Sequence, residues 1–360
     1  MTTRVVDSDA HVIEGQELMA ELLARFPDKI RMARPDEEGA ALVIEGRRYP
    51  NASGPGAGCH AKHGMCLERG ANPFTAAGVL RDADREGIDA MVFFPSAALG
   101  LPAFTDLAFA AEFARLYNRW LAGYCRQFPQ RLFGVGLVPI EDVATSIRVM
   151  REARELGLIA IMVPAVLGTR NLDHRDLEPF YAAAEDLEMP LGIHGAPGIH
   201  LPPLGAERFD NYLQVHVVSF PFDMMVATTA LVLGGVLERH PRLRVALLES
   251  GVGWVPYFFD RLDEHVEKRG RLTPECKREP REYLARGQLH VSCEPEESAL
   301  PFVTATLGDH FVMYASDYPH WDSDFPNSTR GLRERTDLAP EVKARILGAN
   351  AAAFYRLPTS

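Results

Sequence analysis

The chain has 360 residues, a net charge of −11, and 47% hydrophobic residues. This acidic balance excludes nucleic acid as the main partner, because binding to a phosphate backbone requires clustered Lys and Arg. Five irregularly spaced cysteines do not predict a disulfide framework. The sequence contains no uninterrupted apolar stretch of about 18 residues and no leader-like segment, so we expect a cytoplasmic protein with no membrane contact.

Short apolar runs alternate with helical patterns along most of the chain. The helical patterns include residues 106–127, 143–156, 177–187 and 224–239. The apolar runs are typical of parallel strands that are buried on both faces. The predicted strands are residues 4–9, 88–95, 133–139, 159–164, 190–194, 244–249, 288–293 and 311–317. This alternation predicts a parallel α/β fold.

The ends of the predicted strands distinguish a barrel from an open sheet. An open sheet often binds its ligand through a Gly-rich turn after the first strand, whereas the first glycine here is Gly15. Titratable residues instead follow strands one, five, six and eight, and only a closed barrel brings those ends to one mouth. We therefore predict a distorted (β/α)8 TIM barrel that forms a single domain over residues 1–360.

Two long segments interrupt the strand–helix alternation. Residues 30–78 follow the first strand and are rich in Gly and Pro, and residues 195–223 follow the fifth. Long connections in compact domains commonly act as lids or binding loops. We expect residues 30–78 to cover the mouth of the barrel. This segment also contains cysteines and histidines, but their spacing favours a lid over a separate zinc site; they are Cys59, His60, His63 and Cys66.

Asp9 and His11 lie at the end of the first strand. Side chains alternate along a strand, so residues two apart share a face and can hold one ion together. His194 ends the fifth strand and Asp317 the eighth. Each residue alone has an ordinary explanation, as a turn cap or as a packed ring. Together, their positions at strand ends predict a metal site in which Asp317 also accepts a proton from metal-bound water.

Three segments carry a resemblance to a known family. They are the Asp-x-Asp-x-His start at residues 7–11, His194-Gly195, and the Ser-Asp-Tyr-Pro-His stretch at residues 316–320. The sequence resembles the amidohydrolase superfamily, in the branch that contains aminocarboxymuconate-semialdehyde decarboxylase and the resorcylate-type decarboxylases. The resemblance implies a distorted barrel with one or two divalent metals. By position, it implies four ligands, namely Asp9, His11, His194 and Asp317.

The sequence departs from this pattern at several positions. Asp9 stands where many members have histidine, Glu249 occupies the corresponding position after strand six, and residues 159–164 show no bridging lysine. We therefore expect Glu249 to be a further ligand or catalytic group. His216 is a candidate for an extra ligand or a substrate-facing acid, with a helix-surface ring as the alternative. His320 could orient Asp317 or contact substrate.

This ligand set leaves the ion and the reaction open. Two histidines with several carboxylates favour zinc, with manganese or iron as alternatives, and one or two ions could fit. We expect hydrolysis or decarboxylation of a small or medium organic acid, with Asp317 as proton shuttle and Glu249 and His216 as further catalytic groups. A nonheme diiron, oxygen-dependent hydroxylase is an alternative, motivated by Asp9 and Glu249. A non-catalytic binding protein is the second alternative.

The apolar residues around the predicted mouth suggest an aromatic or apolar substrate. The candidates for its pocket are Met65, Phe74, Phe93, Phe94, Phe209, Tyr212, Phe220, Phe222, Met224 and Met225. The segment 211–235 is also apolar enough to form a homodimer interface.

Overall fold

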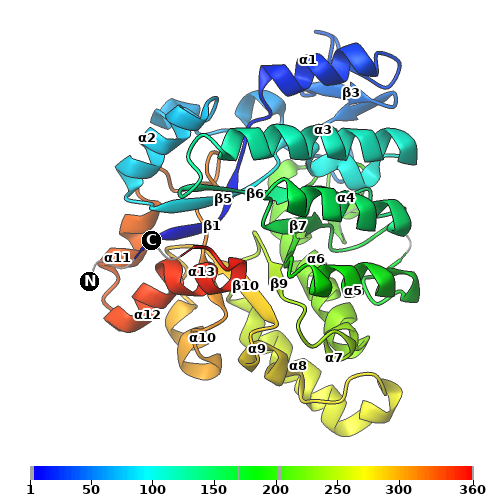
Figure 1. The fold of residues 1–360 in the computed structure, drawn as a ribbon. Helices are drawn as coiled ribbons and strands as arrows, with labels where there is room; N and C mark the ends of the chain where they lie inside the picture. Colours follow the sequence, from blue (N-terminus) through cyan, green and yellow to red (C-terminus); the bar gives the residue numbers. More distant parts are fainter. Residues whose placement is uncertain (1–3, 169, 202–203, 359–360) are drawn as a thin grey trace.

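The computed structural model describes residues 4–168, 170–201 and 204–358. Eight parallel strands form one sheet in which sequence order is also spatial order, and helices surround it (Figure 1). The strands are β1 (Val6–His11), β5 (Ala90–Phe94), β6 (Leu132–Gly136), β7 (Ala160–Val163), β8 (Leu191–Ile193), β9 (Val245–Leu247), β10 (Leu289–Cys293) and β11 (Val312–Tyr314). All eight lie within segments that the apolar runs predict, apart from a two-residue extension at the end of β1 and a one-residue extension at the start of β6.

The sheet closes into a barrel between its first and last strands. The backbone N–H of His11 donates to Tyr318 O over 2.7 Å, just beyond β11. The Ser8 hydroxyl donates to Tyr314 O, also over 2.7 Å. These bonds join the two edge strands, so the predicted (β/α)8 barrel is confirmed.

The end of β1 differs from the prediction, which ended the strand at Asp9. In the pairing of β1 with β5, Asp7 lies opposite Met91 and Ala10 opposite Phe93, so β1 carries one extra residue. Such a bulge redirects side chains locally. The strand therefore continues to His11, so His11 as well as Asp9 lies within the sheet.

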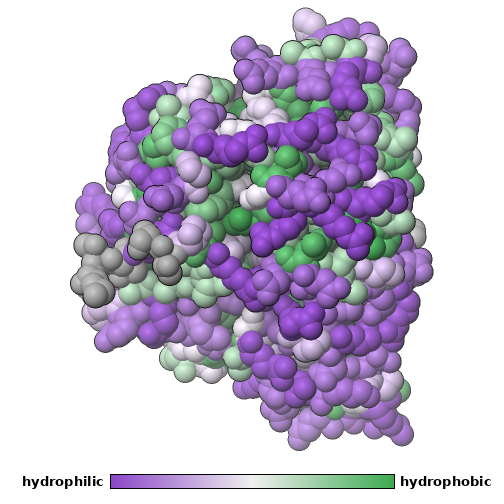
Figure 2. Space-filling view, in the orientation of Figure 1, coloured by the Kyte–Doolittle hydropathy of each residue, from purple (hydrophilic) through white to green (hydrophobic). Residues whose placement is uncertain are grey.

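Helices cover the outside of the barrel, and several begin at a side-chain cap that the sequence makes visible. Asp106 accepts from Phe109 N and Asp142 from Thr145 N, each over 3.0 Å. The face that carries α3, α4 and α5 is largely hydrophilic, with apolar residues between the helices (Figure 2). The helices are α1 (Gln16–Arg25), α2 (Ala76–Glu86), α3 (Leu107–Cys125), α4 (Val143–Glu155), α5 (Glu178–Asp186), α6 (Tyr212–Leu233), α7 (Val236–Arg239), α8 (Trp254–Arg269), α9 (Pro280–Ala285), α10 (Leu300–Leu307), α11 (Ser328–Glu334), α12 (Pro340–Ala344) and α13 (Asn350–Tyr355).

The insertion after β1 has secondary structure that the sequence did not reveal. Residues 30–49 contain a three-stranded antiparallel sheet of β2 (Ile30–Met32), β3 (Leu42–Ile44) and β4 (Arg47–Tyr49). Each strand has only three residues, which is too short to show a periodic pattern. Two 3₁₀ segments follow, η1 (Ala61–His63) and η2 (Leu67–Arg69).

The second long connection is shorter than predicted, because α6 already begins at Tyr212. Asn211 caps it by accepting from Leu213 N over 2.9 Å. Pro221 lies inside this helix, and the helix carries apolar residues on all its sides. A helix without a polar face lacks the usual 3.6-residue period, and proline normally marks a helix end. The prediction therefore included residues 212–223 in the long connection after strand five.

Helix α6 is also, among the residues that the structure describes, the one helix long and apolar enough to cross a membrane by length and composition. Of its most apolar window, 56% is buried inside the protein. Burial of this kind is typical of the core helix of a globular protein, and the helix passes beside the mouth of the barrel.

Candidate metal centre

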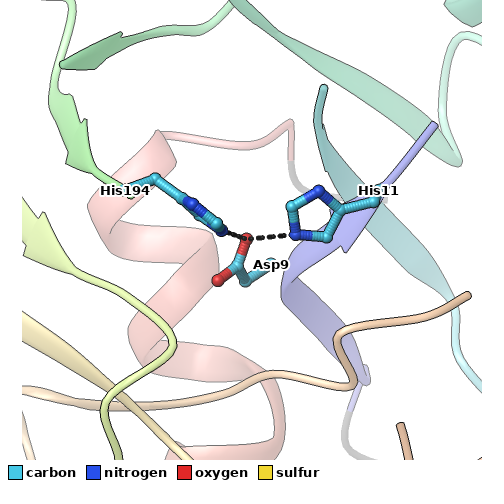
Figure 3. A group of neighbouring side chains, drawn as sticks. All are labelled: Asp9, His11 and His194. Atoms are coloured by element: carbon cyan, nitrogen blue, oxygen red, sulfur yellow. Dashed lines mark ion pairs between the residues drawn. The ribbon is translucent and has the colours of Figure 1, made fainter. Parts of the chain in front are cut away.

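Two histidine rings face one carboxylate at the C-terminal ends of the strands. Asp9 Oδ1 lies 3.8 Å from the Nε2 atoms of both His11 and His194 (Figure 3). The opposite ring nitrogens are occupied: His11 Nδ1 contacts Pro95 O over 2.7 Å and His194 Nδ1 contacts Gly195 O over 2.8 Å. Because a carbonyl oxygen only accepts, each Nδ1 carries the proton, and each Nε2 presents a lone pair to the centre.

Four buried atoms at this point have no hydrogen-bond partner within the described part of the chain. They are Asp9 Oδ1, His11 Nε2, His194 Nε2 and Asp317 Oδ2. Leaving a buried polar atom unpaired costs about 1–3 kcal/mol, so four together indicate that another group completes the site. Two imidazole nitrogens and two carboxylate oxygens form a donor set that fits a divalent cation.

Asp317 links this cluster to His320. Its Oδ1 lies 3.1 Å from His11 Nε2 and 2.9 Å from His320 Nδ1. His320 Nε2 in turn contacts Ser96 Oγ over 3.2 Å. Burial would raise the pKa of Asp317, but His320 and His11 outweigh it and hold that pKa well below the usual range. The structure thus places an ionised carboxylate between the metal ligands and a third histidine.

Glu249 lies immediately beyond β9 and faces two histidines. Its Oε2 is 3.2 Å from His194 Nε2, and its Oε1 is 3.7 Å from His216 Nε2. Burial raises the pKa of Glu249 well above its usual range, and the negative charges of Asp317 and Asp322 add to this effect. An uncompensated carboxylate in this position favours a nearby cation.

Glu249 and Asp317 share an unusual backbone conformation. Their φ angles are +54° and +52°, in the left-handed region that non-glycine residues rarely adopt. Such a conformation costs about 1–3 kcal/mol and is commonly found at functional sites. Both residues occupy the turn directly after a barrel strand, and the conformation sets the direction in which each carboxylate leaves the strand end.

His216 projects from α6 toward the loop after β11. Its Nε2 lies 3.4 Å from Asp322 Oδ2. Its ring also contacts Trp321, with 5.5 Å between centroids, and Trp321 Nε1 donates to the Tyr212 hydroxyl over 3.0 Å. Only 17% of the His216 side chain is exposed, so it is not the helix-surface ring that was the alternative.

The surrounding charges make the centre strongly anionic. Burial raises the pKa of Asp9 well above its usual range, and Asp317 and Asp7 raise it further. Burial also lowers the pKa of His194 to about 3, with a further contribution from His11. The carboxylates resist carrying their charge together, and the ring of His194 remains neutral. Both effects are expected where a positive ion belongs.

Some of the predicted pocket residues lie at the centre and others do not. Phe94 stacks on His194 at 5.4 Å between centroids, and Phe220 lies 4.8 Å from His216. Phe93 points the opposite way and packs against Tyr124 of α3, as strand alternation requires. Among the other candidates, Met224 is fully buried, and Phe74 and Phe222 are exposed.

Sequence reasoning missed Asp322 and Trp321. They lie within five residues of Asp317, in a loop that returns over the mouth, and sequence alone shows no strand end there.

Strand alternation also predicts that Asp7 lies on the same face as Asp9, but the sequence assigned Asp7 no role. In the structure, the Asp7 carboxylate accepts from Ser316 N over 3.0 Å and Ser316 Oγ over 2.5 Å. Asp7 therefore links β1 to the segment after β11, where the barrel closes.

In the part of the chain that the structure describes, the cysteines and histidines of the insertion do not form a group of three or more side chains close enough to hold a metal. Among the described residues, the groups close enough to hold a metal are Asp9–His11–His194, His11–Asp317–His320 and His216–Glu249–Asp322. None of these includes Cys59, His60, His63 or Cys66.

A family model described as "Amidohydrolase" matches residues 6–357. Among curated proteins, the chain is 27% identical to 2-amino-3-carboxymuconate-6-semialdehyde decarboxylase of Dictyostelium discoideum, over 69% of this chain and 67% of that protein. It is 25% identical to gamma-resorcylate decarboxylase of a Rhizobium species, over 77% of this chain and 86% of that protein.

The fold also matches solved structures. One is 5-carboxyvanillate decarboxylase of Novosphingobium aromaticivorans, complexed with manganese and 4-hydroxy-3-methoxy-5-nitrobenzoic acid. The TM-score is 0.71 at 21% identity, and the match covers 99% of this chain and 97% of that one. At this identity, the similarity supports the barrel.

Proposed function

The chain belongs to the amidohydrolase family, and from this premise we propose that it is a divalent-metal-dependent decarboxylase of an aromatic or similarly unsaturated carboxylic acid. One observation carries the proposal: ligand atoms of Asp9, His11 and His194, from β1 and the end of β8, lie within 4.8 Å of one another, and Asp317, after β11, joins His11 in an adjoining group. Each of these four side chains has a buried atom without a hydrogen-bond partner among the described residues. The relatives with this family pattern include decarboxylases that act on such acids, as their names state.

Each proposed residue has a separate task. Asp9, His11, His194 and Asp317 would hold the ion, which supplies Lewis-acid stabilisation of negative charge on the substrate oxygens. The Asp317–His320 pair, joined over 2.9 Å, would hold the proton that is delivered to the substrate carbon as carbon dioxide leaves. Phe94 and Phe220 would form the apolar wall that orients an unsaturated acid and excludes water.

For the ion itself, we propose Mn²⁺ ahead of the zinc expected from the sequence. The donor set is half carboxylate, and further carboxylates surround it, which suits a hard cation. A structurally similar decarboxylase was solved with manganese bound. Metal analysis of untagged protein, followed by reloading the metal-free protein with Mn²⁺, Zn²⁺ or Fe²⁺, decides between these ions.

The reaction is tested with the metal-loaded protein and a panel of hydroxylated benzoic acids and unsaturated dicarboxylic acids. We expect release of carbon dioxide from at least one acid and none from the metal-free protein. Hydrolysis of esters, lactones or amides without carbon dioxide release would replace the proposal with the hydrolase alternative. Oxygen consumption by the iron-loaded protein would favour the hydroxylase alternative.

We also propose that residues 30–78 form a lid fixed to the loop after β8. Asn51 N donates to Gly198 O over 2.9 Å, and Gly58 packs directly against Gly198. On the other side of the mouth, Cys66 N donates to Pro319 O over 2.9 Å. The insertion is thus attached to two loops that carry or follow candidate ligands.

Replacing Gly198 by alanine should detach this lid. Gly198 has φ +75°, and an added Cβ would lie 2.6 Å from the Gly58 backbone. Gly56 is a matched control, because it has φ +74° and nothing within 4 Å of an added Cβ. Both variants carry a backbone cost of about 1–2 kcal/mol, but only Gly198→Ala should speed proteolysis within residues 50–66. Equal cleavage of the two variants would contradict the attachment.

We further propose a homodimer through the outer face of α6. Leu213 and Val217 are 57% and 65% exposed and lie one turn apart. An exposed apolar stripe of this kind commonly marks a subunit interface. Light scattering should give the mass of two chains, and Val217→Glu should give that of one. Phe302→Glu, which changes a 63% exposed residue on α10, serves as the control; a monomeric wild-type protein would refute the dimer.

A further inference from the structure

Beside the proposed ion lies a second group of ligand-type side chains that the proposed mechanism does not use. Suitable atoms of His216, Glu249 and Asp322 all lie within 4.8 Å of one another. They come from α6, the turn after β9 and the loop after β11, so the fold brings together three distant segments. We propose that this group binds a second divalent cation, and that Glu249 bridges the two ions. The inference rests on the proposed metal site.

The two oxygens of Glu249 support the bridging role. Oε2 faces His194 at 3.2 Å, whereas Oε1 faces His216 at 3.7 Å. The carboxylate is 10% exposed, and its ion-pair contacts in the described structure are with these two histidines. A carboxylate that directs one oxygen to each of two histidines is placed to hold an ion on either side. Ion pairs bridged in this way are typically about 3.5–4 Å apart.

Asp322 supplies independent support. Its Oδ2 lies 3.4 Å from His216 Nε2, while its Oδ1 is buried without a hydrogen-bond partner within the described residues. Neither Asp322 nor Glu249 pairs with a Lys or Arg of the described structure; their ion-pair contacts are with histidines. An unpartnered carboxylate oxygen among other carboxylates indicates a missing positive charge.

The negative charge of the whole centre also supports a second cation. Four carboxylates crowd around the two positions, namely Asp9, Asp317, Glu249 and Asp322. Glu294 is a further carboxylate near Glu249. One divalent ion would therefore leave at least two negative charges uncompensated in a largely buried setting, and a second divalent ion would reduce this excess. One imidazole and two carboxylates form a hard donor set with open positions, which suits Mn²⁺ or Fe²⁺ and leaves room for oxygen atoms of an acidic substrate.

The test is a titration of metal-free protein with Mn²⁺, read by metal content and by electron paramagnetic resonance. We expect two ions per chain in the wild-type protein and the signature of an exchange-coupled pair. His216→Ala and Asp322→Asn touch only the second position, so each should retain one ion and lose the coupled signal. Asp324→Asn, an exposed change in the same loop, should bind two ions like the wild type.

The outcomes separate the two proposals. One ion per chain in the wild type, with no coupled signal, would overturn the second site and leave the first intact. No bound ion at all would overturn both. If His216→Ala and Asp322→Asn each still bind two coupled ions, a second ion exists but not at this group, and the inference is wrong.

Discussion

Replacing Asp317 by asparagine should lower kcat by about 1,000-fold, because the amide cannot take up or deliver a proton, and positioned acid–base groups contribute roughly 10²–10⁴-fold. The side chain keeps its size and one oxygen toward His11, so the fold should survive. The measurement is kcat for carbon dioxide release at a fixed, verified metal content. Thermal unfolding of the variant serves to confirm that the barrel is intact.

A matched control for this change is Asp324→Asn, in the same loop. Asp324 is exposed and lies beyond the proposed ligands. Its substitution should leave kcat within about twofold, as expected of a surface change. If Asp317→Asn retains more than a tenth of the wild-type kcat with metal bound, Asp317 is not the proton shuttle, and the proposed reaction needs another acid.

Replacing His194 by alanine should weaken binding of the first ion by at least about 100-fold. Outer partners of metal ligands alone are worth 10–100-fold in affinity, so loss of a direct ligand is expected to exceed that range. The His194 ring also stacks on Phe94, which means that some thermal stability should be lost as well. Equilibrium dialysis with Mn²⁺ measures the affinity.

The informative control for His194→Ala is His265→Ala on α8. His265 is exposed and its Nδ1 contacts only Arg261 O within its own helix, over 2.7 Å. That variant should bind the ion as the wild type does. Wild-type affinity in His194→Ala itself would mean that the ion is held elsewhere, and the proposed centre would be wrong.

The barrel and the family could be predicted because their signals are local. Strands that are buried on both faces, such as β5 and β10, appear as apolar runs in any sequence. Candidate ligands at strand ends follow from the same pattern, since parallel strands of a barrel share one mouth. The structure brings Asp9, His11, His194, Asp317 and Glu249 together there. Their role as ligands stays a prediction.

The remaining features depend on contacts between distant segments. The bulge in β1 is set by pairing with β5, and no residue type in the sequence announces it. Helix α6 is apolar on its buried side and also carries the exposed apolar residues Leu213, Val217 and Phe222. Its sequence therefore lacks the periodic pattern of an amphipathic helix. Asp322 reaches the centre only because its loop folds back over the mouth, where Arg69 donates to the carbonyl oxygens of Trp321 and Ser323.

The seam of the barrel has a consequence for assembly. Asp9 and His11 lie on the first strand and Asp317 just beyond the last, so three of the four proposed ligands sit on the two edges that must meet to close the cylinder. A cation bound across that junction would link the first and last strands of the barrel. At a concentration 1,000 times its dissociation constant, it would add about 4 kcal/mol to the closed form. All four proposed ligands are present only after Asp317 has been synthesised, so binding of the ion by the full set would follow closure of the barrel.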